Sequence, residues 1–246
     1  MIFMKVFGVY GFKKSGKTAV VTSIIRELRR RGYKVAAIKH ISYADFSMDV
    51  PGRDTDMFSK AGARSIGVIS EKETSIIYKE KKPLMEMISF FHADYLVLEG
   101  FRQALVPKIL TAKNKEELEK DFRKEVIAIS GLVANEITEY KGKRAVSIGN
   151  IERLVDIIEE KTFDKIPELN CKGCGLTCEE MLYSIVDGTN TIDDCLTIKK
   201  DIKITIDGKE LPMNAFVQKI IKNSILGMLS TLNDYKKGTI KVRIDT

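Results

Sequence analysis

Residues 5–18 read Lys-Val-Phe-Gly-Val-Tyr-Gly-Phe-Lys-Lys-Ser-Gly-Lys-Thr and contain the most informative pattern of the chain. Their last eight residues, Gly11 to Thr18, have the form G-x-x-x-x-G-K-T. The apolar residues 6–10 are typical of a buried strand. The residues after Thr18 repeat apolar side chains at helical spacing as far as Gly32, which is placed to end a helix. This order of strand, glycine-rich loop and helix predicts a phosphate-binding P-loop.

The predicted phosphate site takes its chemistry from the loop backbone and from two side chains. Gly11 and Gly16 allow backbone N–H groups to turn toward phosphate oxygens, and the positive end of the following helix dipole adds to their field. Lys17 is placed to reach the β- and γ-phosphates, and the Thr18 hydroxyl to bind Mg²⁺. We therefore assign nucleotide binding to the following residues: Gly11, Lys14, Ser15, Gly16, Lys17 and Thr18.

Length and composition set bounds on the fold and on the partners. The chain has 246 residues, enough for one large domain or two smaller ones. Its formal net charge of +7 favours anionic partners such as nucleotides, but no basic tract alternates with aromatic residues as in a nucleic-acid-binding surface. No apolar run is long enough to span a membrane, and no signal-peptide pattern is visible. We expect a cytoplasmic protein that binds neither nucleic acid nor membranes.

Strands and helices are expected to alternate up to residue 161, which predicts a P-loop domain built on a doubly wound, mostly parallel α/β sheet. Further strands are expected at residues 34–38, 65–70, 74–78, 95–99, 106–111, 126–130 and 144–148. Short helices are expected to begin near Asp54, Pro83 and Glu116, and the amphipathic helix 151–160 closes a domain at residues 1–161. Ligands of such sheets bind beyond the carboxyl ends of the strands.

Acidic residues near the expected strand ends are candidate magnesium and catalytic groups. The apolar strand 95–99 ends in Glu99, which is typical of a Walker B element that acts on Mg²⁺ or on the attacking water. The loop-rich segment 40–63 contributes Asp49 as a candidate catalytic group and Asp54 as a candidate magnesium ligand, beside Lys17 and Thr18 of the P-loop. Formation of turns and helix caps is the alternative role for each aspartate.

The sequence Asn114-Lys115-Glu116-Glu117 resembles the N-K-x-D signature with which GTPases read guanine. In that signature the acidic side chain accepts hydrogen bonds from guanine N1 and N2, while the Asn and Lys side chains frame the ring. Asn114, Lys115 and Glu117 are therefore candidate base-reading residues. The alternative is that this stretch only begins the helix expected at residues 116–122.

A second, small α+β domain is expected at residues 171–246, after a linker at residues 161–170 that holds a proline. All four cysteines of the chain lie in this domain with the spacing C-x2-C-x3-C-x16-C: Cys171, Cys174, Cys178 and Cys195. Three thiolates from a compact loop and a fourth from outside favour a [4Fe–4S] cluster. Zn²⁺ is the alternative metal, although structural zinc sites more often show paired C-x2-C knuckles. A redox disulfide or free thiols are the remaining possibilities.

The rest of this domain carries ordinary signals of secondary structure. We expect a strand at residues 202–206, a tight turn at residues 207–208 and a helix capped by Asn214. A final strand is expected at residues 239–244.

Several short segments together resemble the MobB family, nucleotide-binding accessory proteins of molybdopterin-guanine dinucleotide biosynthesis. The segments are residues 11–18, 38–40, 49–55, 61–63, 98–101 and 107–109. The resemblance spans roughly residues 3–160, and the part after Cys171 looks like the iron–sulfur extension of some archaeal and anaerobe members. The chain departs from many relatives in one respect, because residues 41–43 read Ile-Ser-Tyr where a second histidine follows the first one, His40.

The resemblance implies GTP and Mg²⁺ binding, slow GTPase activity, homodimerisation and partnership with a MobA-type guanylyltransferase. It implies a task in molybdenum or tungsten cofactor biosynthesis, in which nucleotide and molybdopterin are held near that enzyme. It carries phosphate binding onto Gly11, Gly16, Lys17 and Thr18, and magnesium or nucleotide roles onto Asp49, Asp54 and Glu99. Two other functions stay open, an ATP-driven chaperone of a metal cluster and a non-catalytic redox adaptor that binds nucleotide.

Overall fold

Five parallel strands form the sheet that carries the predicted phosphate site, in the order β2-β5-β1-β6-β7. The strands are β1 (Lys5–Gly11), β2 (Val35–Lys39), β5 (Tyr95–Glu99), β6 (Lys108–Thr111) and β7 (Val126–Ser130). Their side chains are largely buried in β1, β5, β6 and β7, as expected for central strands of a parallel sheet. The predicted α/β fold with a mostly parallel sheet is confirmed.

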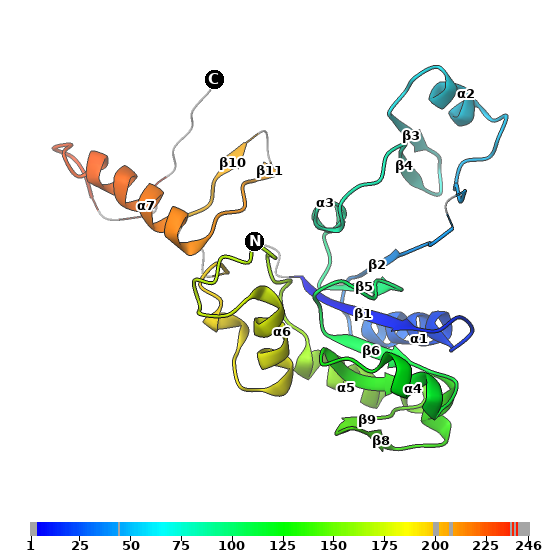
Figure 1. Cartoon of the computed structure of the whole chain (residues 1–246). Helices are drawn as coiled ribbons and strands as arrows, with labels where there is room; N and C mark the ends of the chain where they lie inside the picture. The colour runs from blue at the N-terminus through cyan, green and yellow to red at the C-terminus, as the bar shows by residue number, and fades with distance from the viewer. Residues whose placement is uncertain are drawn as a thin grey trace. The chain divides into compact units, whose positions relative to one another are not determined.

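The structure is a computed structural model that describes residues 4–43, 45–198, 202–206, 209–236, 238 and 240. It divides into two compact units, Met1–Asp164 and Lys165–Thr246 (Figure 1). Within the described ranges, no helix has the length and apolar character needed to cross a membrane.

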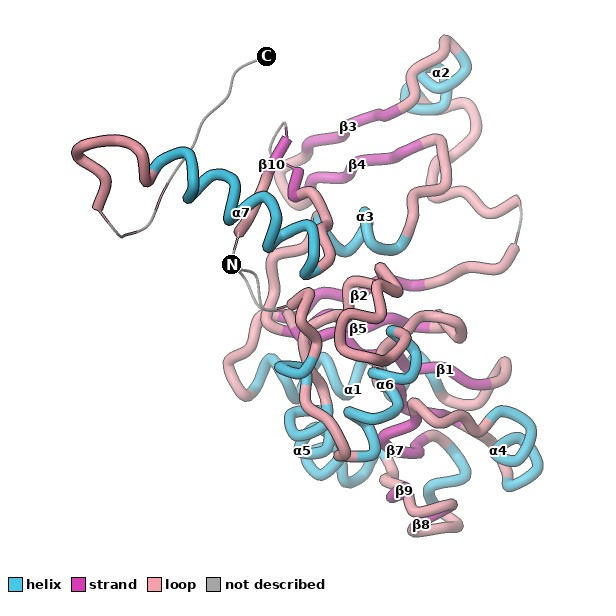
Figure 2. The backbone as a smooth tube through the Cα atoms, turned by 60° about the vertical axis from the view of Figure 1, so that its left-hand side comes forward, coloured by secondary structure: helices cyan, strands magenta, loops and turns pink. Residues whose placement is uncertain are grey.

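Helices cover both faces of the sheet, and alternate residues of β1 show how. Val6 and Tyr10 point to one face, where they join apolar clusters with Ile88 of α3 (Leu84–Ser89) and Leu118 of α4 (Lys115–Asp121). The opposite face is covered by α1 (Lys17–Arg30) and α5 (Ile151–Lys161), which pack against each other and against the sheet (Figure 2). The sheet is therefore doubly wound, as the alternation of elements predicts.

The segment between β2 and α3 forms a separate small substructure. It contains α2 (Asp54–Lys60) and an antiparallel hairpin of β3 (Ser65–Ile69) and β4 (Thr74–Tyr78), as predicted. It leaves large apolar side chains exposed: Met57, Phe58, Ile69 and Ile76. Such a group of exposed apolar residues on a short segment is typical of a surface that contacts another chain.

The prediction of a strand at residues 144–148 is wrong for most of these residues. Lys143–Arg144 forms β9 and pairs antiparallel with β8 (Glu139–Tyr140). Lys141 and Gly142 both have positive φ, 47° and 73°, as in the tight turn that closes a two-residue hairpin. Only Ala145 pairs with β7, through one parallel bridge to Ile129, and the chain then enters the 3₁₀ helix η2 (Ile148–Asn150).

The second unit contains two longer helices and short irregular elements. Its elements are α6 (Cys178–Asp187), the 3₁₀ helix η3 (Ile192–Asp194), β10 (Thr205–Ile206), β11 (Lys209–Glu210) and α7 (Ala215–Leu229). Thr177 and Glu180 form a capping box at the start of α6. The predicted cap of α7 is confirmed, because the Asn214 side chain accepts a hydrogen bond from the Val217 N–H.

Two predictions for the second unit are not matched by described structure. The strand expected at residues 202–206 is shorter, since only Thr205–Ile206 pairs with a neighbour. The turn at residues 207–208 and, except for residue 240, the strand at 239–244 lie outside the described residues.

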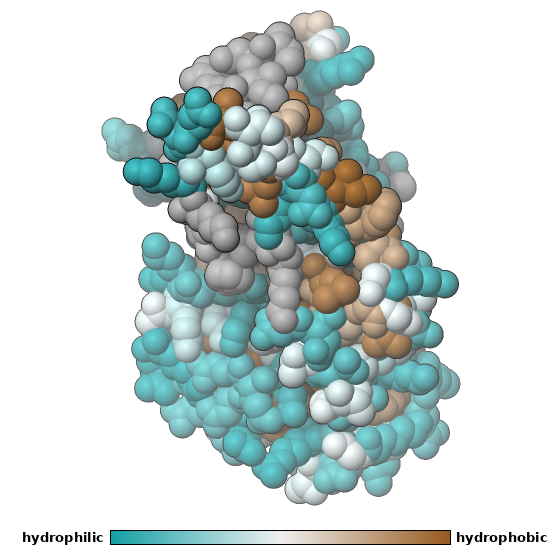
Figure 3. Space-filling view, turned by 90° about the vertical axis from the view of Figure 1, so that its left-hand side faces the viewer, coloured by the Kyte–Doolittle hydropathy of each residue, from teal (hydrophilic) through white to brown (hydrophobic). Residues whose placement is uncertain are grey.

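In α7, Phe216, Ile220 and Met228 are exposed. Figure 3 shows hydrophobic side chains at the surface among hydrophilic ones.

A buried ion pair joins the start of β6 to the residue before β7. Lys108 Nζ lies 2.8 Å from Glu125 Oε1 and donates to the Arg102 carbonyl oxygen at 2.6 Å. Both side chains of the pair are buried, with exposed fractions of 1% and 6%. Burial lowers the pKa of Lys108, while Glu125 acts in the opposite direction.

We expect Lys108→Ala to lower the free energy of unfolding by about 3–5 kcal/mol, because it leaves the Glu125 carboxylate buried without its partner. The double variant Lys108→Met/Glu125→Leu removes both charges and should regain most of that loss. Urea unfolding of both variants measures the difference. Equal destabilisation of the single and double variants would contradict this account of the pair.

Candidate functional site

The P-loop joins β1 to α1 and has the backbone that its glycines predict. Gly16 is the N-cap of α1 with φ 92°, and Gly11 has φ 151°. A Cβ atom at Gly11 would lie 2.0 Å from the Thr111 carbonyl oxygen, so only glycine fits between β1 and β6 there. Lys14 has φ 62° and is exposed beside the loop. The loop is thus shaped by close contact with the neighbouring strand.

Ser15 supports the loop from inside. Its side chain is fully buried, and its Oγ lies 2.7 Å from Thr111 Oγ1. Because the Thr111 hydroxyl donates its proton to the Tyr10 carbonyl oxygen at 3.1 Å, the Ser15 hydroxyl is the donor to Thr111. The structure therefore gives the Ser15 side chain a structural role, which leaves its backbone as the part that can face a ligand.

Lys17 lies over the loop. Its Nζ donates to the carbonyl oxygens of Gly11 at 3.1 Å and Phe12 at 2.5 Å. Burial lowers the pKa of Lys17; Glu99 acts to raise it, and the nearby cations Arg102 and Lys39 lower it further. A lysine held among other cations is well suited to bind an anion.

Glu99 and Thr18 meet at the carboxyl end of β5. The Thr18 hydroxyl donates to Glu99 Oε1 at 3.2 Å, and the same oxygen lies 2.9 Å from Lys39 Nζ. Glu99 is buried, with 8% of the residue exposed. A hydroxyl and a carboxylate are the hard oxygen donors that Mg²⁺ prefers, so the two side chains fit the magnesium site predicted for them.

Two cations at this site, Lys39 and Arg102, were not among the predicted residues. Lys39 ends β2, the strand next to β5; it follows an apolar run and lies in the segment 38–40, one of those that resemble the MobB family. Arg102 follows β5; its guanidinium carbon lies 5.4 Å from the centre of the Phe12 ring. An ion pair of 2.8 Å with Asp121 holds this guanidinium beside the P-loop.

The predicted acidic residues of segment 40–63 have partners of their own. Asp49 accepts a hydrogen bond from the Thr55 hydroxyl at 2.6 Å and pairs with Lys79 Nζ at 2.6 Å. These contacts, Lys79 first, lower the pKa of Asp49. Asp54 is the exposed first residue of α2. The structure thus shows Asp49 joining its loop to Thr55 of α2 and to Lys79, the residue after β4. The catalytic role of Asp49 and the metal role of Asp54 stay predictions.

The candidate base-reading residues form the start of α4. Asn114 Oδ1 accepts a hydrogen bond from the Glu117 N–H at 3.0 Å and caps the helix. The Glu117 carboxylate accepts from the Lys113 N–H at 2.9 Å and pairs with Lys113 Nζ at 3.2 Å. Lys115 is the exposed first residue of the helix. The capping alternative describes these contacts, and guanine reading by the three residues stays a prediction.

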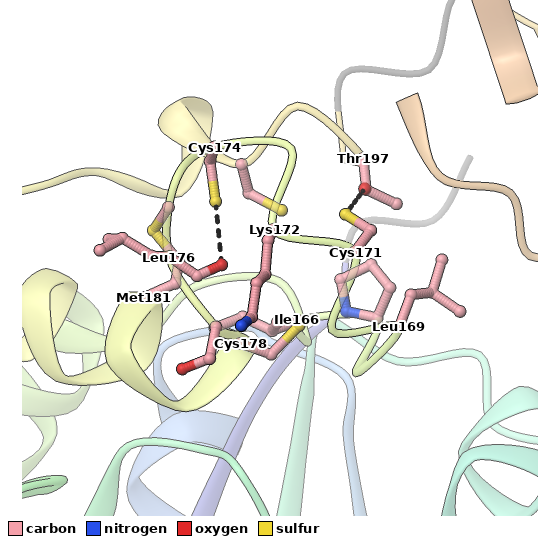
Figure 4. Close-up of a pocket in the computed structure, with 12 residues that line it drawn as sticks. Ile166, Leu169, Cys171, Lys172, Cys174, Leu176, Cys178, Met181 and Thr197 are labelled. Carbon is pink, nitrogen blue, oxygen red and sulfur yellow. Dashed lines mark hydrogen bonds between the residues drawn. The ribbon is translucent and has the colours of Figure 1, made fainter. Parts of the chain in front are cut away.

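The four cysteines line a single pocket of the second unit (Figure 4). Cys171 and Cys174 lie on the loop before α6, Cys178 is the first residue of that helix, and Cys195 follows η3. All four are free thiols, and Cys195 is buried. Apolar side chains also line the pocket (Ile166, Pro167, Leu169, Leu176 and Met181), together with Lys172, Thr177 and Thr197. Within the described ranges, no three potential ligands stand close enough together to define a metal-coordination geometry.

The backbone around this pocket suits an anionic cluster. Four residues of the loop have left-handed φ values, and they are Glu168 (58°), Asn170 (49°), Lys172 (53°) and Gly175 (85°). Left-handed residues alternating with others turn successive N–H groups toward one side, as in the anion-binding concavities of many Fe–S sites. The Asn170 N–H donates to Cys178 Sγ at 3.3 Å. Four thiols and inward N–H groups fit the predicted metal cluster.

Hydrogen bonds and burial distinguish the thiols of this pocket. Thr197 Oγ1 lies 3.3 Å from Cys171 Sγ (Figure 4), and this contact is the main cause that lowers the pKa of Cys171. Burial raises the pKa of Cys195, and the neighbouring Cys174 and Cys178 raise it further. This effect on Cys195 agrees with the position of the three thiols in one pocket.

Comparisons with known proteins find matches over the segments that contain the two candidate sites. A family model described as "MobB: Molybdopterin guanine dinucleotide synthesis protein B" matches residues 6–132, and one described as "FeS: Putative Fe-S cluster" matches residues 166–196. A Methanocaldococcus jannaschii protein named "Putative molybdopterin-guanine dinucleotide biosynthesis adapter protein" is 34% identical over 251 residues, which cover 98% of each chain. A Bacillus subtilis protein named "Probable molybdopterin-guanine dinucleotide biosynthesis adapter protein" is 29% identical over 138 residues, 54% of this chain and 80% of the relative.

The fold also agrees with a solved structure. That structure, described as "The Crystal structure of Bacillus subtilis MobB", aligns with a TM-score of 0.54 and 24% identity, covering 62% of this chain and 97% of the other. The first family model spans the P-loop and Glu99, and the second spans all four cysteines. On the match to residues 6–132 and the near full-length relative, the chain belongs to the MobB family, molybdopterin guanine dinucleotide synthesis protein B.

Proposed function

We propose that this chain is an adapter of molybdopterin-guanine dinucleotide biosynthesis that binds GTP and Mg²⁺ at its P-loop. The observation that carries the proposal is the convergence of Lys17, Thr18 and Glu99 at the carboxyl edge of the sheet. Proteins named as adapters of this biosynthesis are similar along nearly the whole chain or along the first unit. The two lines of support are independent, since one is geometric and the other rests on sequence similarity.

The side chains of the P-loop supply the chemistry for phosphate binding. Lys17 exchanges its contacts with the Gly11 and Phe12 carbonyl oxygens for contacts with phosphate oxygens. Thr18 and Glu99 would hold Mg²⁺, which when bound neutralises charge on the β- and γ-phosphates. We propose that hydrolysis is slow, because a Glu99 carboxylate that holds Mg²⁺ is not free to orient the attacking water.

The partners follow from the family and from the exposed apolar segment. We propose that the base is guanine and that Asn114, Lys115 and Glu117 approach it from the loop after β6. The ligand is held for a MobA-type guanylyltransferase and for molybdopterin, in molybdenum or tungsten cofactor synthesis. Exposed Met57 and Phe58 of α2, with the neighbouring hairpin, support a homodimer or contact with that enzyme.

The second unit would hold one [4Fe–4S] cluster, with Zn²⁺ as the alternative metal. Cys171, Cys174, Cys178 and Cys195 would be its ligands, as four thiolates are the usual ligand set of such a cluster. The match to an Fe–S family model over residues 166–196 and the left-handed loop backbone support this assignment.

We expect Lys17→Ala to abolish triphosphate binding and to leave the fold intact, because loss of its charge-assisted contacts costs a few kcal/mol. The matched control is Lys13→Ala, since Lys13 is an exposed loop lysine bonded to the Tyr43 hydroxyl. Calorimetric titration with GTP measures both variants, and circular dichroism checks their fold. Unchanged GTP affinity in folded Lys17→Ala protein would refute the P-loop assignment.

GTP should compete at least about tenfold better than ATP for the site, a difference of roughly 1.4 kcal/mol. The reason is the family expectation of guanine, helped by the acidic residue at position 117. Displacement of a fluorescent nucleotide by each triphosphate measures the ratio. Equal competition would favour the ATP-driven cluster chaperone over the guanine-binding adapter.

Protein made and kept without oxygen should contain iron and sulfide in the ratio of one [4Fe–4S] cluster per chain. Replacement of any one of the four cysteines by Ser should loosen the second unit, because metal binding supplies folding energy there, and should leave GTP binding unchanged. Metal and sulfide analysis with visible absorbance provides the measurement. One zinc per chain with no sulfide would show that the pocket is a zinc site.

A further inference from the structure

One oxygen of Glu99 serves two partners, Thr18 and Lys39. Glu99 Oε1 accepts from the Thr18 hydroxyl at 3.2 Å and pairs with Lys39 Nζ at 2.9 Å. A divalent cation held by Thr18 and Glu99 would bind this same carboxylate, and it carries twice the charge of an ammonium group. Lys39 and the cation therefore compete for one carboxylate.

The contact between Lys39 and Glu99 is fixed by the sheet. The two residues are direct partners in the parallel pairing of β2 with β5, so their side chains emerge at the same level. The next residue, His40, donates its N–H to the Glu99 carbonyl oxygen at 2.9 Å, and the His40 ring packs against the Phe101 ring at 5.3 Å. These backbone and ring contacts hold the stem of Lys39 beside Glu99.

The two side chains differ in their freedom to move. The Glu99 side chain is 11% exposed, whereas the Lys39 side chain is 56% exposed. Lys39 can thus leave the carboxylate for solvent or for a bound phosphate, while Glu99 stays in place. Lys39 also contributes to the lowered pKa of Lys17, so its charge already acts on the residue that faces the phosphates.

We infer that Lys39 is the internal competitor of the divalent cation at Glu99, and that it sets the metal concentration needed for tight triphosphate binding. Metal binding displaces Lys39 from Glu99 and frees its ammonium group to pair with the triphosphate. Lys39 thereby couples the metal site to the phosphate site. The inference rests on the proposed binding of a triphosphate and Mg²⁺ at this P-loop, and it is independent of the base.

The test uses the full chain and inorganic tripolyphosphate, which has no base. Tripolyphosphate affinity is measured by calorimetry over a series of MgCl₂ concentrations for wild type, Lys39→Met and Lys13→Met. Methionine keeps the length of the lysine stem and removes the charge. Lys13→Met is the matched control, because Lys13 bonds to the Tyr43 hydroxyl and has no carboxylate partner in its described contacts.

Lys39→Met should lower the half-saturating Mg²⁺ concentration about threefold, since a partly exposed ion pair no longer competes for Glu99. Lys13→Met should leave that midpoint at the wild-type Mg²⁺ concentration. Electron paramagnetic resonance of Mn²⁺ added with tripolyphosphate gives a second measure of metal affinity, and Lys39→Met should again bind metal more tightly.

An unchanged or raised midpoint in folded Lys39→Met protein would overturn the inference, and so would an equal shift in Lys13→Met. Equal affinity of the wild type for GTP and ATP would refute guanine selectivity and leave the inference standing. If the wild type binds no tripolyphosphate at any Mg²⁺ concentration, the proposed phosphate site and the inference both fail.

Discussion

The parallel pairing of β1 between β5 and β6 is the constraint on which the candidate site depends. Pairing with β6 brings the Thr111 carbonyl oxygen so close to Gly11 that no side chain fits, and it seats the Ser15 hydroxyl on Thr111. Pairing with β5 sets Val9 opposite Glu99, so the carboxylate emerges level with the start of the loop. Carboxyl ends of parallel strands meet at one edge, and both the loop and the acid therefore lie there.

The part of this site that follows from local sequence could be predicted, and the part that depends on strand order could not. The P-loop, its flanking strand and helix, and Glu99 each carry a short pattern that needs no knowledge of neighbours. Lys39 and Arg102 lie at the site only because β2 and the chain after β5 meet the P-loop in space. Lys39 lies in a segment that resembles the MobB family, but neither cation carries a local pattern of its own that predicts a place beside the phosphate site.

One segment that departs from its prediction, and one whose pattern fits two roles, show how local backbone chemistry competes with longer patterns. The Lys141-Gly142 turn folds residues 143–144 back on residues 139–140, so an apolar run that suits a sheet strand is interrupted. Asn114 and Glu117 resemble a base-reading signature, yet an Asn followed three residues later by Glu is also a helix start. The same side chains satisfy either pattern, and the helix needs its cap whether or not a nucleotide is bound.

The two proposed sites hold an anion by different means. Around the P-loop, Lys17, Lys39 and Arg102 repel one another, so a bound triphosphate relieves their repulsion as well as forming new contacts. Around the cysteines, the left-handed residues Glu168 and Lys172 each cost about 1–2 kcal/mol, which the surrounding contacts must offset. Thiolate–metal bonds and N–H groups directed at sulfur are contacts of sufficient strength. The sheet shapes the phosphate site of the first unit, whereas the loop of the second would be stabilised by the cluster proposed for it.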